Sequence, residues 1–299
     1  MKKKNDTVRI CHFSDLHLLP SEHVPLRTLF GKRFLGYANL KLNRGKTHSI
    51  APLRHLLRCV AEAQADKVVV TGDFTSLSLD FEFRYIDALF KESGLTPERT
   101  MVIPGNHDRY TMTADVTSAF ETGLAEWLPA NMSKTTGYPI TEILGPVVLF
   151  GLDTAVWRNP IRAAGAISDN QLNRLNIGLS PEKLDGRWPV IAMHHPPIYR
   201  DKKFLDHYRT GLAGYRRFIE SINRPATVIH GHMHIAIRSK VAGLDIIGVP
   251  SASNNTGIPE TQFAYYVYTF SQNGLQKVEV NRFWPNKTDG SMQRECFEL

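Results

Sequence analysis

Two short phrases concentrate most of the reactive side chains of this sequence. Residues 104–108 read PGNHD, and residues 230–234 read HGHMH. Imidazole, amide and carboxylate groups of this kind are rarely buried without a specific partner. They are also the ligands that hard to borderline divalent metal ions prefer. The two phrases therefore indicate a metal-binding function more than a structural one.

Similar polar groups follow several apolar runs along the chain. The runs VRICHF, KVVV, TMVI, VVLFGL, PVIAM and TVI lead directly into polar clusters: Ser14 to His17, Thr71 to Asp73, Pro104 to Asp108, Asp153–Thr154, His194–His195 and His230 to His234. Short apolar runs predict buried strands, and the helical patterns between them are typical of an α/β domain. Ligands in such folds collect at the carboxyl ends of the strands, so we expect the polar clusters to meet.

The groups expected to meet outnumber the ligands of a single tetrahedral ion. They are Asp15, His17, Asp73, Asn106, His107, Asp108, His194, His232 and His234. They suffice for two metal ions that share a carboxylate, an arrangement that recurs in phosphoester hydrolysis with the ions roughly 3.5–4 Å apart. In the pairs Asp15-x-His17 and His232-x-His234, an extended backbone would point both side chains to the same side.

Other local patterns predict the elements around these groups. Glycines 72, 105 and 231 are expected to let the backbone turn sharply beside the site. Apolar residues at helical spacing predict helices over 49–65 and 79–94, the second ending at Gly94. The runs over 244–253, 262–270 and 275–284 are expected to form consecutive antiparallel strands.

The ordered motifs resemble the signature of the calcineurin-like metallophosphoesterases. They are Asp15-Leu16-His17, Gly72-Asp73, Gly105-Asn106-His107-Asp108, His194 and Gly231-His232-Met233-His234, in family order over residues 15 to 234. Each motif alone is weak, whereas the ordered set is specific. The resemblance implies an α/β fold in four layers, with two mixed β-sheets packed as a sandwich and flanked by helices. We expect a single domain over residues 1–299, with a basic amphipathic insertion at about 24–48.

The resemblance also implies a role for each matching residue. One metal would be held by Asp15, His17, Asp73 and His234, and the other by Asp73, Asn106, His194 and His232. A hydroxide held by the metals would attack phosphorus. His107 would stabilise the transition state or protonate the leaving oxygen, and Asp108 would orient His107. His194, which directly ends its strand, would be the ligand, and His195 would lie behind it or face the substrate.

The sequence departs from the family pattern at one point and leaves the metals unnamed. Many relatives carry Gly-Asp-x-x-Asp or Gly-Asp-x-x-Asn, where this chain has Gly72-Asp73-Phe74-Thr75-Ser76. The shared carboxylate is kept, so we expect different surroundings of the metals and no loss of them. The two ions, divalent or trivalent, would be Mn, Fe, Zn or Co, because Asp, Asn and His suit all four.

The substrate is narrowed by resemblance within the family. The phrases TGDFTSLSLDFEFRYIDALF, VIPGNHDRY and MHHPPI are similar to the bacterial branch of class III cyclic-nucleotide phosphodiesterases and glycerophosphodiesterases. A phosphodiesterase of small or lipid-linked substrates is therefore expected. Two alternatives stay open: an enzyme like the UDP-2,3-diacylglucosamine pyrophosphate hydrolases, which the phrase FSDLHL would suit, and a metal-poor interaction scaffold, which the complete ligand set disfavours.

Composition limits the partners and the compartment. The net charge of +7 favours anionic partners, but without a basic track interleaved with aromatic residues, nucleic acid is disfavoured. Three scattered cysteines, no signal-peptide pattern and no bilayer-spanning run predict a cytoplasmic protein. Residues 27–46 mix six basic with several apolar side chains. They would form a lid, a contact with the inner face of an anionic membrane, or an ordinary packed hairpin. The oligomeric state is left open.

Overall fold

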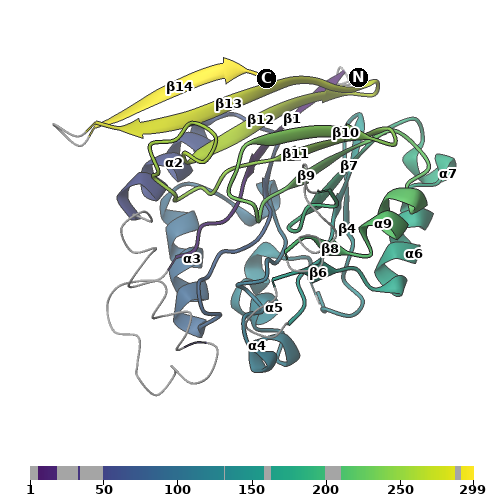
Figure 1. Ribbon diagram of the computed structural model, residues 1–299, viewed down its shortest axis with the longest axis horizontal. Helices are drawn as coiled ribbons and strands as arrows, with labels where there is room; N and C mark the ends of the chain where they lie inside the picture. The colour runs from purple at the N-terminus through teal and green to yellow at the C-terminus, as the bar shows by residue number, and fades with distance from the viewer. Residues whose placement is uncertain are drawn as a thin grey trace.

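The fold is built from two six-stranded sheets between layers of helices (Figure 1). The structure is a computed structural model, and it describes residues 6–18, 33, 50–130, 132–157, 163–198, 210–286 and 291–299. Of the expected insertion at 24–48, every residue except Arg33 lies outside these ranges.

The first sheet combines parallel and antiparallel strands in the order β14-β13-β12-β1-β2-β3. Strands β1, β2 and β3 are parallel, and their bounds are Thr7–Phe13, Lys67–Val70 and Thr100–Val102. Strands β12, β13 and β14 add antiparallel pairs, and their bounds are Ala264–Ser271, Gly274–Pro285 and Met292–Glu298. The carboxyl ends of the three parallel strands therefore share one edge of the sheet.

The second sheet has the order β10-β11-β9-β7-β5-β4. Its four central strands are parallel: β5 (Val147–Gly151), β7 (Trp188–Met193), β9 (Ala226–His230) and β11 (Leu244–Gly248). The edge strands β4 (Ile140–Leu144) and β10 (Ile237–Val241) are antiparallel. A short parallel pair joins β6 (Gly165–Ala166) and β8 (Leu212–Ala213). The predicted architecture of two mixed sheets with flanking helices is confirmed.

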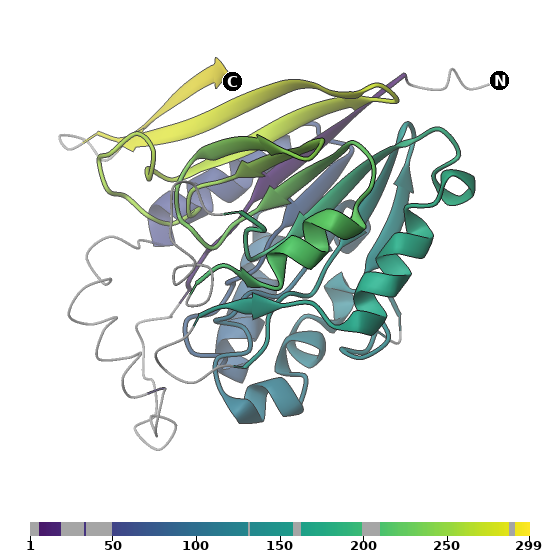
Figure 2. The ribbon, with the colours of Figure 1, turned by 45° about the vertical axis from the view of Figure 1, so that its right-hand side comes forward.

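Helices cover the outer faces of both sheets, as the two views of the ribbon show (Figures 1 and 2). On the side of the first sheet lie α2 (Ile50–Glu62) and α3 (Asp80–Glu92), which confirm the two predicted helices. Gly94 follows the end of α3 with φ +86°, the left-handed geometry expected there. On the side of the second sheet lie α6, α7 and α9, with the bounds Asp169–Gly178, Pro181–Leu184 and Tyr215–Ser221.

Shorter helical turns lie along the chain directly before and after β3. They are η3 (Pro97–Arg99), α4 (Met112–Val116), α5 (Ala119–Gly123) and η4 (Ala125–Trp127). Met112 and Val116 of α4 are exposed, whereas Phe120 of α5 is fully buried. These turns therefore attach to the core through a few apolar side chains.

The core explains why the central strands are apolar without interruption. Along β7, Val190 and Ala192 belong to the main core cluster, which includes residues of both sheets, whereas Ile191 and Met193 belong to a second cluster with α6 and α9. Successive side chains of a strand point to opposite faces, so a strand covered on both faces needs apolar residues at every position. Burial of apolar surface, which contributes about 25 cal/mol per Å², then holds the two sheets together.

One predicted connection is wrong. Strands β12 and β13 pair antiparallel as expected, but β11 belongs to the other sheet and runs parallel to β9. After β11 the chain crosses to the first sheet, where Ser251 forms a parallel bridge to Ser14 and the Ala252 amide donates to the Ser14 carbonyl at 2.8 Å. Apolar alternation alone cannot reveal such a crossing, because it does not specify the partner strand.

Candidate metal centre

The predicted polar clusters come together where β1, β2, β3, β7 and β9 end. Main-chain hydrogen bonds tie the first two loops together: the Asp15 amide donates to the Gly72 carbonyl at 3.0 Å, and the His17 amide to the Asp73 carbonyl at 2.9 Å. On the other side, the Ser251 hydroxyl donates to the Asp15 carbonyl at 2.6 Å. Backbone hydrogen bonds thus fix the first two loops to each other, and the side chain of Ser251 adds a further connection.

Five of the predicted ligand residues have a left-handed backbone. The φ angles are +58° at Asp15, +47° at His17, +54° at Asp73, +68° at His232 and +53° at His234. Non-glycine residues adopt this region at a cost of order 1–3 kcal/mol each, and they do so mainly at functional sites. The expectation that the Asp-x-His and His-x-His pairs are extended is therefore wrong, because each pair converges through two left-handed residues.

The first group of side chains contains Asp15, His17 and His234. The Nε2 atoms of the two imidazoles lie 2.9 Å apart, and Oδ1 of Asp15 lies 3.2 Å from Nε2 of His234 and 3.8 Å from Nε2 of His17. Asp15 is fully buried, and its Oδ1 accepts no hydrogen bond from the described residues. Three ligand atoms thus converge on a point without a donor that satisfies the buried oxygen.

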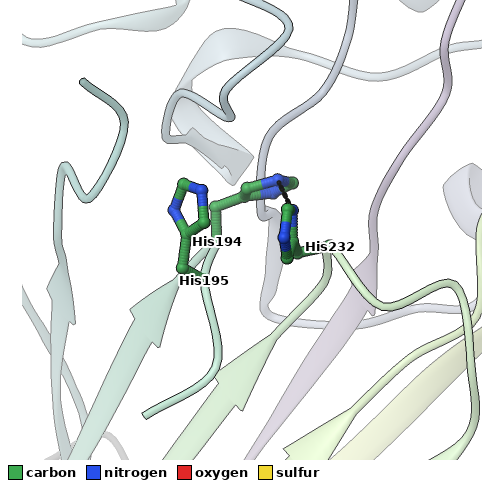
Figure 3. A group of neighbouring side chains, drawn as sticks. All are labelled: His194, His195 and His232. Atoms are coloured by element: carbon green, nitrogen blue, oxygen red, sulfur yellow. Dashed lines mark hydrogen bonds between the residues drawn. The ribbon is translucent and has the colours of Figure 1, made fainter. Parts of the chain in front are cut away.

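The second group contains Asn106, His194 and His232. Nε2 of His194 lies 3.2 Å from Oδ1 of Asn106 and 3.2 Å from Nδ1 of His232. Nδ1 of His194 lies 2.6 Å from the Thr71 carbonyl, so this nitrogen donates and Nε2 carries the lone pair of the neutral ring. Figure 3 shows the rings of His194 and His232 meeting through Nε2 of His194 and Nδ1 of His232.

Asp73 lies between the two groups. Its Oδ2 is 3.6 Å from Nε2 of His17 and 3.4 Å from Nε2 of His194, and its Oδ1 accepts the His107 amide at 2.7 Å. One carboxylate oxygen therefore faces a histidine of each group. This is the position that a carboxylate shared by two ions would occupy.

The donor set fits metal ions. Four overlapping sets of three carboxylate or imidazole ligands each have their ligand atoms within 4.8 Å of one another: His194 with His195 and His232, Asp15 with His17 and His234, His17 with Asp73 and His107, and Asp15 with Asp73 and His194. With Asn106, all seven predicted ligand residues lie in this cluster. Nitrogen and oxygen ligands without a thiolate suit borderline to hard cations.

The electrostatics of the cluster also favour a cation. Burial would raise the pKa of Asp15, but His234 and His194 hold it below its usual value, and in the same way His194 and His107 hold the pKa of Asp73 well below its own. Burial would lower the pKa of His194, but Asp73 raises it to about 9. Burial followed by the charge of His194 lowers the pKa of His232 to about 3. Two buried carboxylates thus require positive charge at this place, which a proton or a metal ion supplies.

His107 stands beside this cluster with a fixed ring orientation. Its Nδ1 lies 2.8 Å from the Ser76 carbonyl, which can only accept, so Nδ1 carries the proton. The ring stacks on Tyr110 at 5.1 Å and meets His17 edge-on at 4.7 Å. Nε2 is therefore the nitrogen at which this ring can exchange a proton with a substrate.

Asp108 has a different task from the one expected. Its Oδ1 accepts from the amide and hydroxyl of Thr75 at 3.0 and 3.1 Å, and its Oδ2 accepts from the amides of Gly105 and Phe74 at 2.9 and 3.3 Å. The prediction that it orients the ring of His107 is corrected, because Ser76 binds that ring. Asp108 instead joins the loop after β2 to the loop after β3, and its burial and the charge of Asp73 raise its pKa to about 7.

The glycines beside the site serve mainly to make room. A Cβ at Gly105 would lie 2.2 Å from Oδ1 of Asp73, and one at Gly231 would lie 1.9 Å from Oγ of Ser14. Gly72 has φ +91° and also contacts Gly105 closely, with 2.5 Å from its would-be Cβ to the Gly105 amide nitrogen. The expected sharp turn thus holds for Gly72, whereas the other two glycines permit a close approach of loops.

His195 lies behind His194, the predicted ligand, and is hydrogen-bonded at both ring nitrogens. Nε2 donates to the Ala163 carbonyl at 3.0 Å, and Nδ1 accepts from the Thr154 hydroxyl at 2.9 Å. Its ring contacts those of His194 and His232 at centroid distances of 4.9 and 4.5 Å (Figure 3). This is one of the two positions that the sequence left open for His195.

Several supporting residues have no clear signal in the sequence. Ser76 donates to the His17 carbonyl at 2.8 Å, and Glu82 accepts the amides of Ser76, Leu77 and Leu79. Only the departure Gly-Asp-x-x-Ser pointed to this loop. The hydrogen bond of Ser251 to the Asp15 carbonyl connects residues remote in sequence, which a local pattern does not reveal, whereas Thr154 belongs to a strand-end cluster that the sequence did indicate.

The family follows from a comparison with known proteins. A model of the calcineurin-like phosphoesterases matches residues 8–236. The chain belongs to the calcineurin-like phosphoesterase family. This metal-dependent phosphoesterase is 20% identical over 244 residues to a probable cyclic nucleotide phosphodiesterase of Vesicomyosocius okutanii subsp. Calyptogena okutanii (strain HA), covering 78% of this chain and 88% of the relative. It is 33% identical over 94 residues to one of Synechococcus sp. (strain WH7803), covering 29% of this chain and 35% of that relative.

Solved structures share the fold of this calcineurin-like phosphoesterase. A dimetal phosphatase from Danio rerio has a TM-score of 0.58 at 15% identity, covering 97% of this chain and 98% of its own. A purple acid phosphatase from yellow lupin also has a TM-score of 0.58, at 12% identity, covering 98% of this chain and 53% of its own. Among the described residues of the phosphoesterase, no helix has the length and apolarity that crossing a membrane requires.

Proposed function

We propose that this phosphoesterase hydrolyses a phosphodiester at a centre of two metal ions. The observation that supports it is the place of Asp73, whose Oδ2 lies 3.6 Å from His17 of one ligand group and 3.4 Å from His194 of the other. The proposed ligands of one ion are Asp15, His17, Asp73 and His234, and those of the other are Asp73, Asn106, His194 and His232.

The metal ions and the side chains would have different roles in the reaction. When bound, the metals, which would be Mn, Fe, Zn or Co, would neutralise phosphate oxygens and lower the pKa of a water molecule. His107, held at Nδ1 by the Ser76 carbonyl, would give a proton from Nε2 to the leaving oxygen. Positioned proton transfer of this kind contributes typically 10²–10⁴-fold to the rate. The net charge of +7 would attract an anionic substrate.

The names of the relatives favour a diester over a monoester. Both curated relatives are described as probable cyclic nucleotide phosphodiesterases. We therefore propose a small phosphodiester as substrate, with a lipid-linked phosphodiester as the further candidate from sequence. Contact with a membrane through residues 27–46, and a place at the inner face of a cytoplasmic membrane, remain sequence predictions, because that stretch lies outside the described residues apart from Arg33.

The test compares a diester with a monoester on the same protein. Manganese-reconstituted protein is assayed with bis(p-nitrophenyl) phosphate and p-nitrophenyl phosphate, next to Asp73→Asn. Asp169→Asn serves as the control, because this exposed carboxylate pairs only with Arg217 among the described residues. A diester preference that is lost in Asp73→Asn and kept in Asp169→Asn supports the proposal. A monoester preference contradicts the substrate class, and inactivity with less than one metal per chain would favour the scaffold alternative.

A positive result leads to the choice among natural substrates. Cyclic nucleotides, glycerophosphodiesters and lipid pyrophosphates are then compared by kcat/KM under the same metal loading. The class with the highest kcat/KM identifies the groups that the enzyme recognises next to the phosphate. The metal centre cannot select among these classes, because it would bind the phosphate that all of them share.

A further inference from the structure

Arg33 is the one described residue of the basic stretch, and it makes a two-point contact close to the metal centre. Its Nε donates to the Leu77 carbonyl at 3.0 Å, and its Nη2 donates to the Ser78 carbonyl at 2.8 Å. The side chain is half-buried. A planar guanidinium that binds two successive carbonyls fixes both distance and orientation, which a single ammonium group does not.

The loop that receives Arg33 is the loop that holds His107. The Ser76 carbonyl accepts Nδ1–H of the His107 ring at 2.8 Å, and the Ser78 hydroxyl donates to the His107 carbonyl at 2.6 Å. The ring and the backbone of His107 are therefore both fastened to residues 76–78. A shift of this loop would move the imidazole relative to the cluster of ligands.

The conformation of this loop depends on contacts from outside it. Ser78 has φ +54°, a left-handed angle that costs a non-glycine residue of order 1–3 kcal/mol and persists only where its surroundings enforce it. On the inner side, Glu82 accepts the amides of Ser76, Leu77 and Leu79 at 2.9, 3.2 and 2.8 Å. Arg33 binds the carbonyls of the same turn. One side chain, Glu82, therefore holds its amides, and another, Arg33, holds its carbonyls.

Two acidic residues in the first turn of α3 interact with Arg33. Glu82 is fully buried, and burial raises the pKa of its carboxyl to about 8 although three amides bind it. Burial lowers the pKa of the Arg33 guanidinium, and its interactions with Glu82 and Asp80 oppose that effect. The carboxyl group that binds the amides of this loop therefore also interacts with the side chain that binds its carbonyls.

We propose that Arg33 is a positioning residue for His107, acting by holding the carbonyls of Leu77 and Ser78 and thereby the Ser76 carbonyl that sets the orientation of the imidazole. This assignment rests on the proposed function, in which His107 protonates the leaving oxygen. It gives one member of the basic stretch a task inside the active site that differs from attraction of an anionic substrate.

A double-mutant comparison tests whether Arg33 acts through His107. The variants are Arg33→Gln, His107→Asn and the two combined, assayed as manganese-loaded protein with bis(p-nitrophenyl) phosphate and with a diester of a poorer alkoxide leaving group. Arg33→Gln is expected to lower kcat about 10-fold with KM within about 2-fold, because small displacements of a catalytic group reduce the rate while leaving binding intact. The loss is expected to be larger for the alkoxide, and absent on the His107→Asn background.

Matched variants separate geometry from charge. Arg33→Lys keeps the charge but not the two-point fork, so most of the loss in kcat should remain. Lys41→Gln removes one positive charge from the same stretch and should leave kcat unchanged. An equal loss in the presence and absence of His107, a loss in KM alone, or full activity of Arg33→Lys would each overturn the proposal.

A second readout needs no activity. In metal-free protein labelled with ¹⁵N-histidine, the His107 resonances, identified by their absence in His107→Asn, report which ring nitrogen carries the proton. Protonation at Nδ1 is expected in the natural sequence, and a mixture of tautomers in Arg33→Gln and Arg33→Lys. An unchanged Nδ1-protonated signal in both folded variants would contradict the positioning role. Inactivity of the natural sequence, or an active His107→Asn, would instead reject the proposed function and leave this spectral result readable.

Discussion

His17 and His234 are 217 positions apart in the sequence, and their Nε2 atoms lie 2.9 Å from each other. Two imidazole nitrogens at this distance cannot both carry a proton, so a shared proton or a cation between them is required. Asp15 faces the same point with a buried oxygen. The pair thus marks the position at which one ion would bind.

Replacing His234 should therefore empty one of the two sites. In His234→Ala, we expect the metal content after manganese reconstitution to fall from about two ions to about one per chain. Loss of an outer-shell partner already weakens metal binding by roughly 10–100-fold, and loss of a ligand should weaken it at least as much. Elemental analysis of the desalted protein measures this. His55→Ala, a histidine on α2 that lies outside the ligand cluster, should keep two ions. Equal metal content in the two variants would show that His234 is no ligand.

A methyl group at position 105 should disturb the carboxylate shared by the two groups. The new Cβ of Gly105→Ala would lie 2.2 Å from Oδ1 of Asp73. The required shift of Asp73 should reduce kcat by about 100-fold, and overpacking should cost about 1–3 kcal/mol of unfolding free energy. Urea denaturation and diester hydrolysis measure the two effects.

The matched control for this change is Gly257→Ala. Gly257 has φ +73° but nothing within 4 Å of a Cβ, so the change strains the local backbone without pushing on Asp73. It should lower stability by about 1 kcal/mol and leave kcat unaltered. If Gly105→Ala behaves like this control, the close approach of the two loops is not needed for activity.

Asp108→Asn should destabilise the joint between the loops after β2 and β3. The amide group offers one acceptor oxygen where the carboxylate offers two, so at least one of the amides of Gly105, Phe74 and Thr75 loses its partner inside the protein. A buried donor left without a partner costs about 1–3 kcal/mol. Thermal or urea unfolding of the metal-free protein measures it. A fully stable variant whose His107 ring changes tautomer would restore the role in orienting His107 that the structure does not support.

The folded protein should lose stability in mild acid through His12. This imidazole is fully buried between the Tyr268 hydroxyl and the Thr71 hydroxyl, and burial lowers its pKa from 6.5 to about 3. The pKa of His12 is lower in the folded protein than in the unfolded chain. Its contribution to the free energy of unfolding is therefore complete above pH 6.5 and is lost as the pH falls towards 3. From pH 7 to pH 5 the loss from this group is about 2 kcal/mol.

His12→Gln isolates this contribution. Glutamine keeps a donor and an acceptor but does not take up a proton, so the drop in unfolding free energy from pH 7 to pH 5 should be smaller by about 2 kcal/mol than in the natural sequence. Both proteins are compared without metal, so that protonation of the ligand cluster affects them equally. Parallel pH profiles of the two proteins would show that His12 is not held neutral.

The sequence was sufficient for the identity of the clustered residues and for the architecture. The motif residues meet because they follow parallel strands, and the ends of parallel strands share an edge. The left-handed angles at Asp15 and His232 were not predictable, since hydrogen bonds between distant loops impose them against local preference. The same holds for Ser76 binding the ring of His107, and for β11 joining β9, because such partners are selected by three-dimensional packing.

The proposed ligand residues are divided between the two sheets. Asp15, Asp73 and Asn106 follow strands of the first sheet, and His194 and His232 follow strands of the second. An ion bound by them would therefore cross-link the sheets, and a folding intermediate with only one sheet formed would have half a site. Metal addition should accordingly slow amide hydrogen exchange in β1 and β7 together, and protection confined to one sheet would argue against ions held by both. Metal affinity would then depend on how cooperatively the two sheets unfold.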